Sequence, residues 1–174
     1  MNVISPARSS WTAREITLTA VMTAAVFLAT FLPKIPIPLG YAHLGDAVIF
    51  LSLCLAGRRE AIIAACLGSM LADFMGGFAL WMGPTLIIKW LMALTFAEIA
   101  NFKAGNFLTS PRTFIALIAA CIVMAAGYTI FGAILYDNLL AGLSSAPGLL
   151  AEGAVNILAF YALIKPLKKV NGFL

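Results

Sequence analysis

The chain has 174 residues, of which 63% are hydrophobic and only 10% are charged, and its mean hydropathy is +1.03. A soluble domain of this length needs more polar surface, so the composition excludes an ordinary water-soluble globular protein. The net charge of +4 comes from short basic clusters between apolar segments, a pattern that indicates membrane topology rather than nucleic-acid binding.

The apolar stretches are long and do not alternate with a period of two, which favours helices over the strands of a β-barrel. We expect an all-α, polytopic protein of the plasma membrane. It forms a bundle of six transmembrane helices and a single domain over residues 1–174. The predicted spans cover residues 12–32, 43–56, 60–75, 81–100, 112–136 and 146–164.

The first span resembles the start of a signal peptide, but its apolar run is too long and has no convincing cleavage site, so we expect a retained helix. It carries small residues at four-residue spacing, which lets another helix approach closely. Internal packing and the docking of a partner membrane protein both explain this spacing. The residues are Ala20 with Ala24, and Ala25 with Ala29.

The second span is too short to cross a hydrocarbon core of about 30 Å at about 1.5 Å per residue. The preceding proline-rich segment, residues 33–41, is therefore expected to dip inward against protein. Asp46, in the first turn of this span, is either a helix cap or a binding residue. His43 is either a surface residue or part of a site.

The third and fourth spans carry ionisable residues, and each such residue costs about 2.5–3.5 kcal/mol at the bilayer centre. Asp73 and Lys89 either neutralise each other as a structural ion pair or contact a ligand. Thr85 lies one turn before Lys89. Trp81 is either an interfacial anchor or a wall of the same site.

The fifth and sixth spans add further polar and aromatic candidates. Tyr128 and Tyr136 of the fifth span have rings suited to the wall of a cavity. Glu152 and Asn156 of the sixth span lie one turn apart. They form either a polar contact between helices or part of a binding site.

The orientation in the membrane follows from the basic residues, because cytoplasmic loops are enriched in lysine and arginine. Both termini are predicted to be cytoplasmic, and Glu98 is expected to be an interface residue on that side. The basic residues assigned to the cytoplasmic side are Arg8, Arg14, Arg58, Arg59, Lys103, Arg112, Lys165, Lys168 and Lys169.

In this orientation the polar residues of four spans all fall in the outer half of the bilayer. Separate structural pairs need not do so, which favours one cavity that opens to the outside. Mixed charge, hydrogen-bond donors and aromatic faces suit a small polar heterocycle. The candidate substrate-binding residues are His43, Asp46, Asp73, Trp81, Thr85, Lys89, Glu152 and Asn156.

Several chemistries have no motif in the sequence. There is no G-x-x-x-x-G-K-[ST] phosphate loop, so energy for transport must come from other subunits. No nucleophile elbow or zinc-protease motif is present, and we expect no enzyme. A single histidine and three dispersed cysteines favour neither a metal site nor another cofactor.

Three segments together resemble one family of membrane proteins. They are HLGDAVIF at residues 43–50, GSMLAD at 68–73 followed by two glycines, and PTLIIK at 84–89. In order and spacing they are similar to the substrate-binding S components of energy-coupling factor (ECF) vitamin transporters, in the branch of riboflavin, pyridoxine and hydroxymethylpyrimidine carriers. The resemblance covers nearly the whole chain.

The resemblance implies that a water-soluble vitamin or precursor, pyridoxine-like or hydroxymethylpyrimidine-like, is bound near the outer surface. It implies three partners, a transmembrane coupling subunit and two ATPases, and docking through Ala20, Ala24, Ala25 and Ala29. It also implies transport by toppling of the whole S component. Two alternatives stay open: a proton-coupled carrier with Asp73, Glu152 and Lys89 as its relay, and an intramembrane enzyme.

Overall fold

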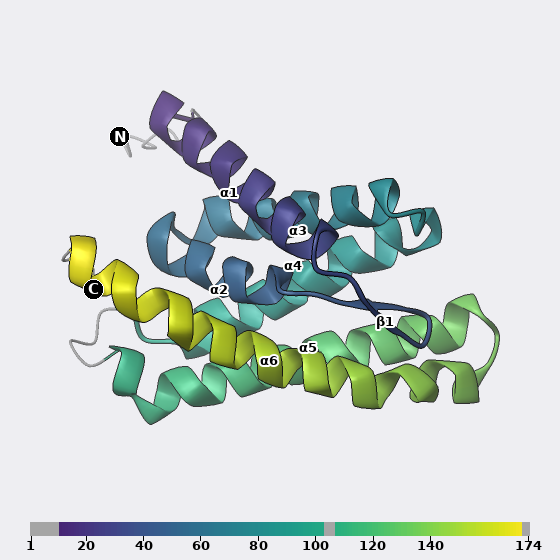
Figure 1. Cartoon of the computed structure of the whole chain (residues 1–174). Coiled ribbons are helices and arrows are strands. Elements are labelled where there is room, and N and C mark those ends of the chain that lie inside the picture. The colour runs from purple at the N-terminus through teal and green to yellow at the C-terminus, as the bar shows by residue number, and fades with distance from the viewer. Residues whose placement is uncertain (1–10, 103–106, 172–174) are drawn as a thin grey trace, which may run out of the picture.

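The computed structural model describes residues 11–102 and 107–171, with side chains as far as residue 167. Within these residues the chain forms six α-helices, two short 3₁₀ turns and one β-hairpin (Figure 1). The helices are α1 Ala13–Phe31, α2 Gly45–Leu55, α3 Arg58–Met75, α4 Met82–Ile99, α5 Pro111–Leu135 and α6 Leu139–Asn171. The strands are β1 Ile35–Ile37 and β2 Gly40–Ala42, and the turns are η1 Ala79–Trp81 and η2 Phe107–Thr109.

Local sequence signals fix several helix ends. Thr12 and Glu15 form a capping box in which each side chain binds the other's backbone N–H at the start of α1. Ser110 caps α5, and Pro111 occupies its first position, where no N–H is needed. Gly57 separates α2 from α3 with φ of 103°, a conformation that glycine adopts without strain.

The helices surround a core in which α2 lies centrally. α1 packs on α3 and α2, α4 lies between α3 and α5, and α6 packs on α5 and α2. Phe50 of α2 meets Phe96 of α4 and Phe160 of α6, with ring centroids 4.9 and 6.3 Å away. A Cβ at Gly68 would lie 2.8 Å from the carbonyl oxygen of Thr23, so glycine permits the close approach of α3 to α1.

The connections between helices divide the bundle into two ends. Figure 1 shows the start of α1, the α2–α3 turn and the last turns of α6 at one end, and the hairpin, the α3–α4 turn and the α5–α6 turn toward the other. Arg58, Arg59 and Lys165 belong to the first end. Arg8 and Lys103, which contribute to the predicted orientation, lie outside the described residues, and so do the side chains of Lys168 and Lys169.

Among the described residues, four helices are long and apolar enough to cross a membrane: Ala13–Phe31, Ala79–Ile99, Pro111–Leu135 and Leu139–Leu167. Large apolar side chains cover the outer surface, for example Leu158 at 71% and Ile134 at 66% exposure, as expected when lipid is the solvent. The structure is therefore that of a mostly helical membrane protein. The number of spans and the side of the termini stay predictions.

The structure differs from the sequence expectation in two elements, the segment before α2 and the sixth helix. The all-α description omits the hairpin, in which Ile35 pairs with Ala42 and Ile37 with Gly40. The sixth helix runs from Leu139 to Asn171 and not from residue 146 to 164. It begins early because Asn138 Oδ1 accepts the backbone N–H groups of Leu140 and Ala141 and so caps the helix there. The inward-facing segment before α2 agrees with the expectation in one respect: Ile37 packs against the core and against Gly148 of α6.

Candidate functional site

A pocket lies at the hairpin end of the bundle, bounded by the hairpin, the ends of α3 and α5, η1 and the first turns of α6. Its volume is about 50 Å³, below the range of about 300–1,000 Å³ that is typical of small-molecule sites. The pocket is lined by Ile37, Pro38, Leu39, Gly40, Tyr41, His43, Asp73, Phe78, Trp81, Tyr128, Ser145, Leu149 and Glu152.

The hairpin covers the pocket and is fastened by one polar contact. Tyr41 Oη donates to Asp73 Oδ1 at 3.1 Å, and the Tyr41 ring lies 5.1 Å from Phe78. Burial and the Asp73 charge raise the pKa of Tyr41, so its hydroxyl stays a donor. The turn is tight, since Leu39 has φ of 65°, a value that residues with a Cβ rarely adopt.

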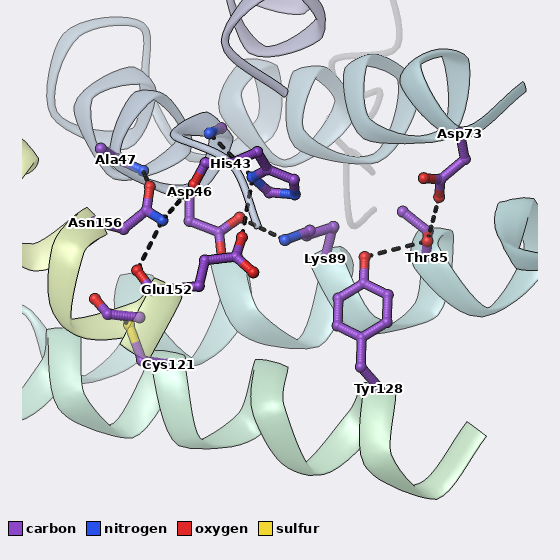
Figure 2. Close-up of polar contacts among 12 residues, drawn as sticks. His43, Asp46, Ala47, Asp73, Thr85, Lys89, Cys121, Tyr128, Glu152 and Asn156 are labelled. Atoms are coloured by element: carbon purple, nitrogen blue, oxygen red, sulfur yellow. Dashed lines mark hydrogen bonds and ion pairs between the residues drawn. The ribbon is translucent and has the colours of Figure 1, made fainter. Parts of the chain in front are cut away.

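Asp73 also connects three helices on the far side of the pocket. Its Oδ2 accepts from Thr85 Oγ1 at 2.5 Å, and the Thr85 hydroxyl lies 3.1 Å from Tyr128 Oη (Figure 2). The carboxylate of α3 thereby has partners on β2 and α4, and α4 in turn contacts α5. Asp73 is 8% exposed and Thr85 is 1% exposed.

Lys89 and Asp46 form an ion pair beneath the pocket, and both residues are 0% exposed. Figure 2 shows the Lys89 amine pointing to the Asp46 carboxylate, with the ring of Tyr128 nearby; the amine lies 5.3 Å from that ring's centroid. This corrects the alternative in which Lys89 pairs with Asp73. Asp46 is also not a cap of its own helix, because its carboxylate binds a lysine of α4.

Asn156 joins α6 to the start of α2. Its Oδ1 accepts from the backbone N–H of Ala47 at 2.8 Å, in the first turn of α2. Its Nδ2 donates to the carbonyl oxygens of His43 at 2.8 Å and of Glu152 at 2.9 Å. Asn156 thus satisfies one free N–H at the N-terminus of α2, a contact that fits the interhelical interpretation of this residue.

His43 and Glu152 meet at the pocket wall. His43 Nδ1 accepts from the backbone N–H of Gly45 at 3.2 Å and lies 3.1 Å from Glu152 Oε1. His43 precedes α2, and burial, followed by the charge of Lys89, lowers its pKa to about 4. Its imidazole is therefore neutral at pH 7 and buried, in contrast to the surface interpretation.

The predicted site residues fall into two groups. His43, Asp73, Trp81 and Glu152 line the pocket. The others lie behind its wall and are almost fully buried: Asp46, Thr85, Lys89 and Asn156. The geometry alone does not test which of them contacts a ligand, and their binding roles stay predictions.

Sequence reasoning missed part of the pocket wall. Tyr41 and Phe78 line it from the hairpin and the α3–α4 turn, and Ser145 and Leu149 line it from α6. The proline-rich hairpin sequence was a signal for Tyr41, since it predicted a segment folded against protein, whereas Phe78 lies in the turn between α3 and η1 and had no such signal. Ser145 precedes the predicted start of the sixth span, and Leu149 lies inside that span but is apolar and was not distinguished from core residues. Tyr128 lines the pocket as expected, whereas Tyr136 is not among its lining residues and its ring is tilted against that of Trp81, with centroids 6.4 Å apart.

A second, apolar groove of about 690 Å³ runs along α1 and α3. Ala20 and Ala24 line it, but Ala25 and Ala29 do not. Near one end Arg59 stacks on Trp11, with the guanidinium carbon 3.9 Å from the ring centroid. The remaining lining residues are Ile16, Thr19, Thr23, Phe27, Ile63, Leu67 and Leu71.

Known proteins resemble this chain over most of its length. A family model described as the S component of an ECF-type riboflavin transporter matches residues 10–169. The thiamine precursor transporter HmpT of Lactococcus lactis subsp. cremoris is 31% identical over 170 residues, which cover 92% of this chain and 93% of that protein. An uncharacterized protein of Pyrococcus woesei is 33% identical over 114 residues, 64% of this chain and 74% of that protein.

Proposed function

The chain belongs to the family of S components of ECF-type riboflavin transporters, substrate-binding subunits of the plasma membrane, and we propose that its pocket captures a pyridoxine-like or hydroxymethylpyrimidine-like vitamin or precursor. The observation that carries this substrate class is the placement of two carboxylates, Asp73 and Glu152, among aromatic rings in one small pocket. Carboxylates accept hydrogen bonds from amino and hydroxyl groups, and aromatic rings stack on a planar heterocycle.

Size and charge favour a one-ring substrate. The pocket is small, and a three-ring flavin requires a larger displacement of the hairpin than a single pyrimidine or pyridine does. The similarity to a thiamine precursor transporter over nearly the full chain supports a small precursor as well. No lysine or arginine lines the pocket among the described residues, which favours a neutral or cationic substrate over a phosphate ester.

The test is a ligand screen of the detergent-purified chain by thermal shift and native mass spectrometry. A ligand that binds only the folded state raises the midpoint of unfolding by mass action. We expect stabilisation by pyridoxine or by 4-amino-5-hydroxymethyl-2-methylpyrimidine, and weaker or no stabilisation by riboflavin. Stabilisation by riboflavin alone would disprove the substrate class, though not the capture of a vitamin.

The wider architecture is part of the same proposal. The chain is one six-span domain with both termini in the cytoplasm, and it delivers substrate through a transmembrane coupling subunit and two ATPases without chemical conversion. Reporter fusions at the C-terminus test the orientation, since a reporter active only outside the cell contradicts it. Uptake by this chain alone that collapses with the proton gradient would favour the proton-coupled carrier instead.

Docking of the coupling subunit is assigned to the apolar groove that Ala20 and Ala24 line. Ala24→Leu fills this groove, so it should abolish uptake in cells that contain the partner subunits and leave vitamin binding unchanged. Ala126→Leu, at an exposed position of α5, is the matched control and should preserve both. Normal uptake by the Ala24→Leu variant would contradict the docking assignment.

A further inference from the structure

Two buried polar atoms on the pocket wall accept or donate no hydrogen bond within the described residues. They are Trp81 Nε1, an indole N–H donor, and Glu152 Oε1, a carboxylate acceptor. Trp81 is 6% exposed and Glu152 is 5% exposed, and both line the pocket. Buried polar groups in folded proteins are normally paired, so these two atoms are candidates for contacts with a ligand.

The nearest histidine does not satisfy Glu152. His43 Nδ1 already accepts the N–H of Gly45, so the side of the ring that faces Glu152 presents a lone pair. The two atoms lie 3.1 Å apart, and Glu152 Oε1 has no hydrogen-bond partner among the described residues. Figure 2 shows the Glu152 carboxylate beside the Lys89–Asp46 pair, and the Lys89 amine is directed at Asp46.

The pocket walls suit a flat ring beside these two atoms. Tyr41 and Phe78 form one aromatic pair with centroids 5.1 Å apart, and Trp81 and Tyr128 form a second at 5.6 Å. A ligand that enters displaces any water in the pocket and must replace the hydrogen bonds of that water. It therefore needs an acceptor opposite Trp81 and a donor opposite Glu152.

We propose that Trp81 and Glu152 are the specificity-determining residues of this pocket, which rests on its proposed function as a vitamin site. Trp81 Nε1 donates to a ring nitrogen of the bound heterocycle, and Glu152 Oε1 accepts from an exocyclic N–H or O–H group. A ring that lacks the exocyclic donor leaves the Glu152 oxygen buried without a partner and is rejected. The pocket thereby distinguishes vitamin precursors of equal size by their hydrogen-bond pattern.

The experiment measures dissociation constants by titration calorimetry on the full-length chain in detergent. The probes are 4-amino-5-hydroxymethyl-2-methylpyrimidine and two analogues, one without the amino group and one without the hydroxyl group. Wild-type protein should bind at least one analogue about tenfold more weakly than the parent, which corresponds to about 1.4 kcal/mol. This comparison requires no variant and so does not depend on how a substitution folds.

Two variants then assign the contacts. Glu152→Gln removes the charge but keeps the shape, and it should weaken the parent about tenfold while leaving unchanged the analogue that lacks the donor. Trp81→Phe should weaken all three pyrimidines about equally, because all keep their ring nitrogens. The matched controls are Glu98→Gln and Trp90→Phe. Both residues lie at exposed positions of α4, and both variants should bind as wild type does.

The outcomes separate this inference from the proposal beneath it. Failure of wild-type protein to bind any of the three pyrimidines disproves the proposed pyrimidine substrate and, with it, the assigned contacts. If the parent and both analogues bind with equal affinity, the role of Glu152 is disproved, whereas the role of Trp81 is not. A Glu152→Gln effect of the same size on all three ligands has the same consequence, and an unchanged affinity of the Trp81→Phe variant disproves the role of Trp81.

Discussion

The buried pair of Lys89 and Asp46 yields the sharpest stability prediction. Lys89→Met keeps a long apolar stem but leaves Asp46 with no cation, and Asp46 Oδ2 already has no hydrogen-bond partner among the described residues. Removal of one partner from a buried pair costs about 3–5 kcal/mol. Relaxation and water entry around the stranded carboxylate keep the cost in the lower part of this range, at about 3–4 kcal/mol.

The assay is thermal unfolding of the purified chain in detergent at pH 7. For a chain of this length about 1 kcal/mol shifts the midpoint by roughly 2–4 °C, so a cost of about 3–4 kcal/mol lowers it by about 6–16 °C. The double variant Asp46→Asn/Lys89→Met buries no charge and should recover more than half of the loss. Arg58→Met, which breaks the exposed pair with Glu98, is the control and should shift the midpoint by less than about 4 °C.

Two results would refute this reasoning. If Lys89→Met unfolds within about 2 °C of wild type, the charge left on Asp46 is solvated and the pair is not buried in the working protein. If the double variant loses as much as the sum of the two single variants, the residues contribute independently and not as a pair.

Three further predictions concern the pocket. Tyr41→Phe removes the hydroxyl that fastens the hairpin to Asp73, and stopped-flow measurement should find vitamin release about tenfold faster; an unchanged rate would mean that this bond does not hold the hairpin closed. The pKa of His43 is lowered to about 4, so the folded state disfavours protonation of its imidazole. The contribution of His43 to the free energy of unfolding is therefore full above about pH 6.5 and falls by about 1.4 kcal/mol per pH unit as the pH drops toward 4. Thermal scans of the His43→Gln variant should show a smaller slope. The phosphate ester of the bound pyrimidine should bind at least about tenfold more weakly than the free alcohol by calorimetry, because no lysine or arginine among the described residues lines the pocket to pair with it. Equal affinity would show that a cation reaches the pocket.

The family and the location of the pocket were predictable because they depend on the order of motifs along the chain and on the depth of polar residues within their spans. Asp73, Trp81 and Glu152 were assigned to the predicted outer parts of their spans, and the structure brings all three to one pocket wall. Hydropathy also placed α1, α3, α4 and α5 within two residues of their observed bounds, because each is bounded by a cap, a glycine or a charged turn.

The choice of ion-pair partner was not predictable from spacing. Asp46 and Asp73 both lie within reach of a lysine at the depth of Lys89, and the sequence does not give the rotation of α2 about its axis. The structure sets that rotation through Asn156, whose side chain binds Ala47 and the carbonyl of His43 from α6. A contact over more than a hundred residues of chain leaves no local periodicity to detect.

The start of α6 was mistaken for a different physical reason. Gly142 lies before the predicted start at residue 146, and Pro147 and Gly148 lie just after it, yet all three belong to the helix. A Cβ at Gly142 would collide with the backbone of α5, and one at Gly148 would lie 2.9 Å from Ile37 of the hairpin. These glycines therefore permit close packing of the first turns of α6 and do not end the helix.

The arrangement of paired and unpaired groups relates the buried residues to binding. Behind the pocket wall, Lys89 is paired with Asp46, and Asn156 bonds to Ala47, His43 and Glu152, so α2, α4 and α6 are held in one relative position. On the wall, Trp81 Nε1 and Glu152 Oε1 have no hydrogen-bond partner among the described residues. Affinity for a small ligand depends on such atoms being fixed before it arrives, since ordering them at the time of binding costs free energy. Asn156 holds both the backbone of His43 and that of Glu152, and we therefore expect it to control affinity through the position of these two residues without touching the ligand.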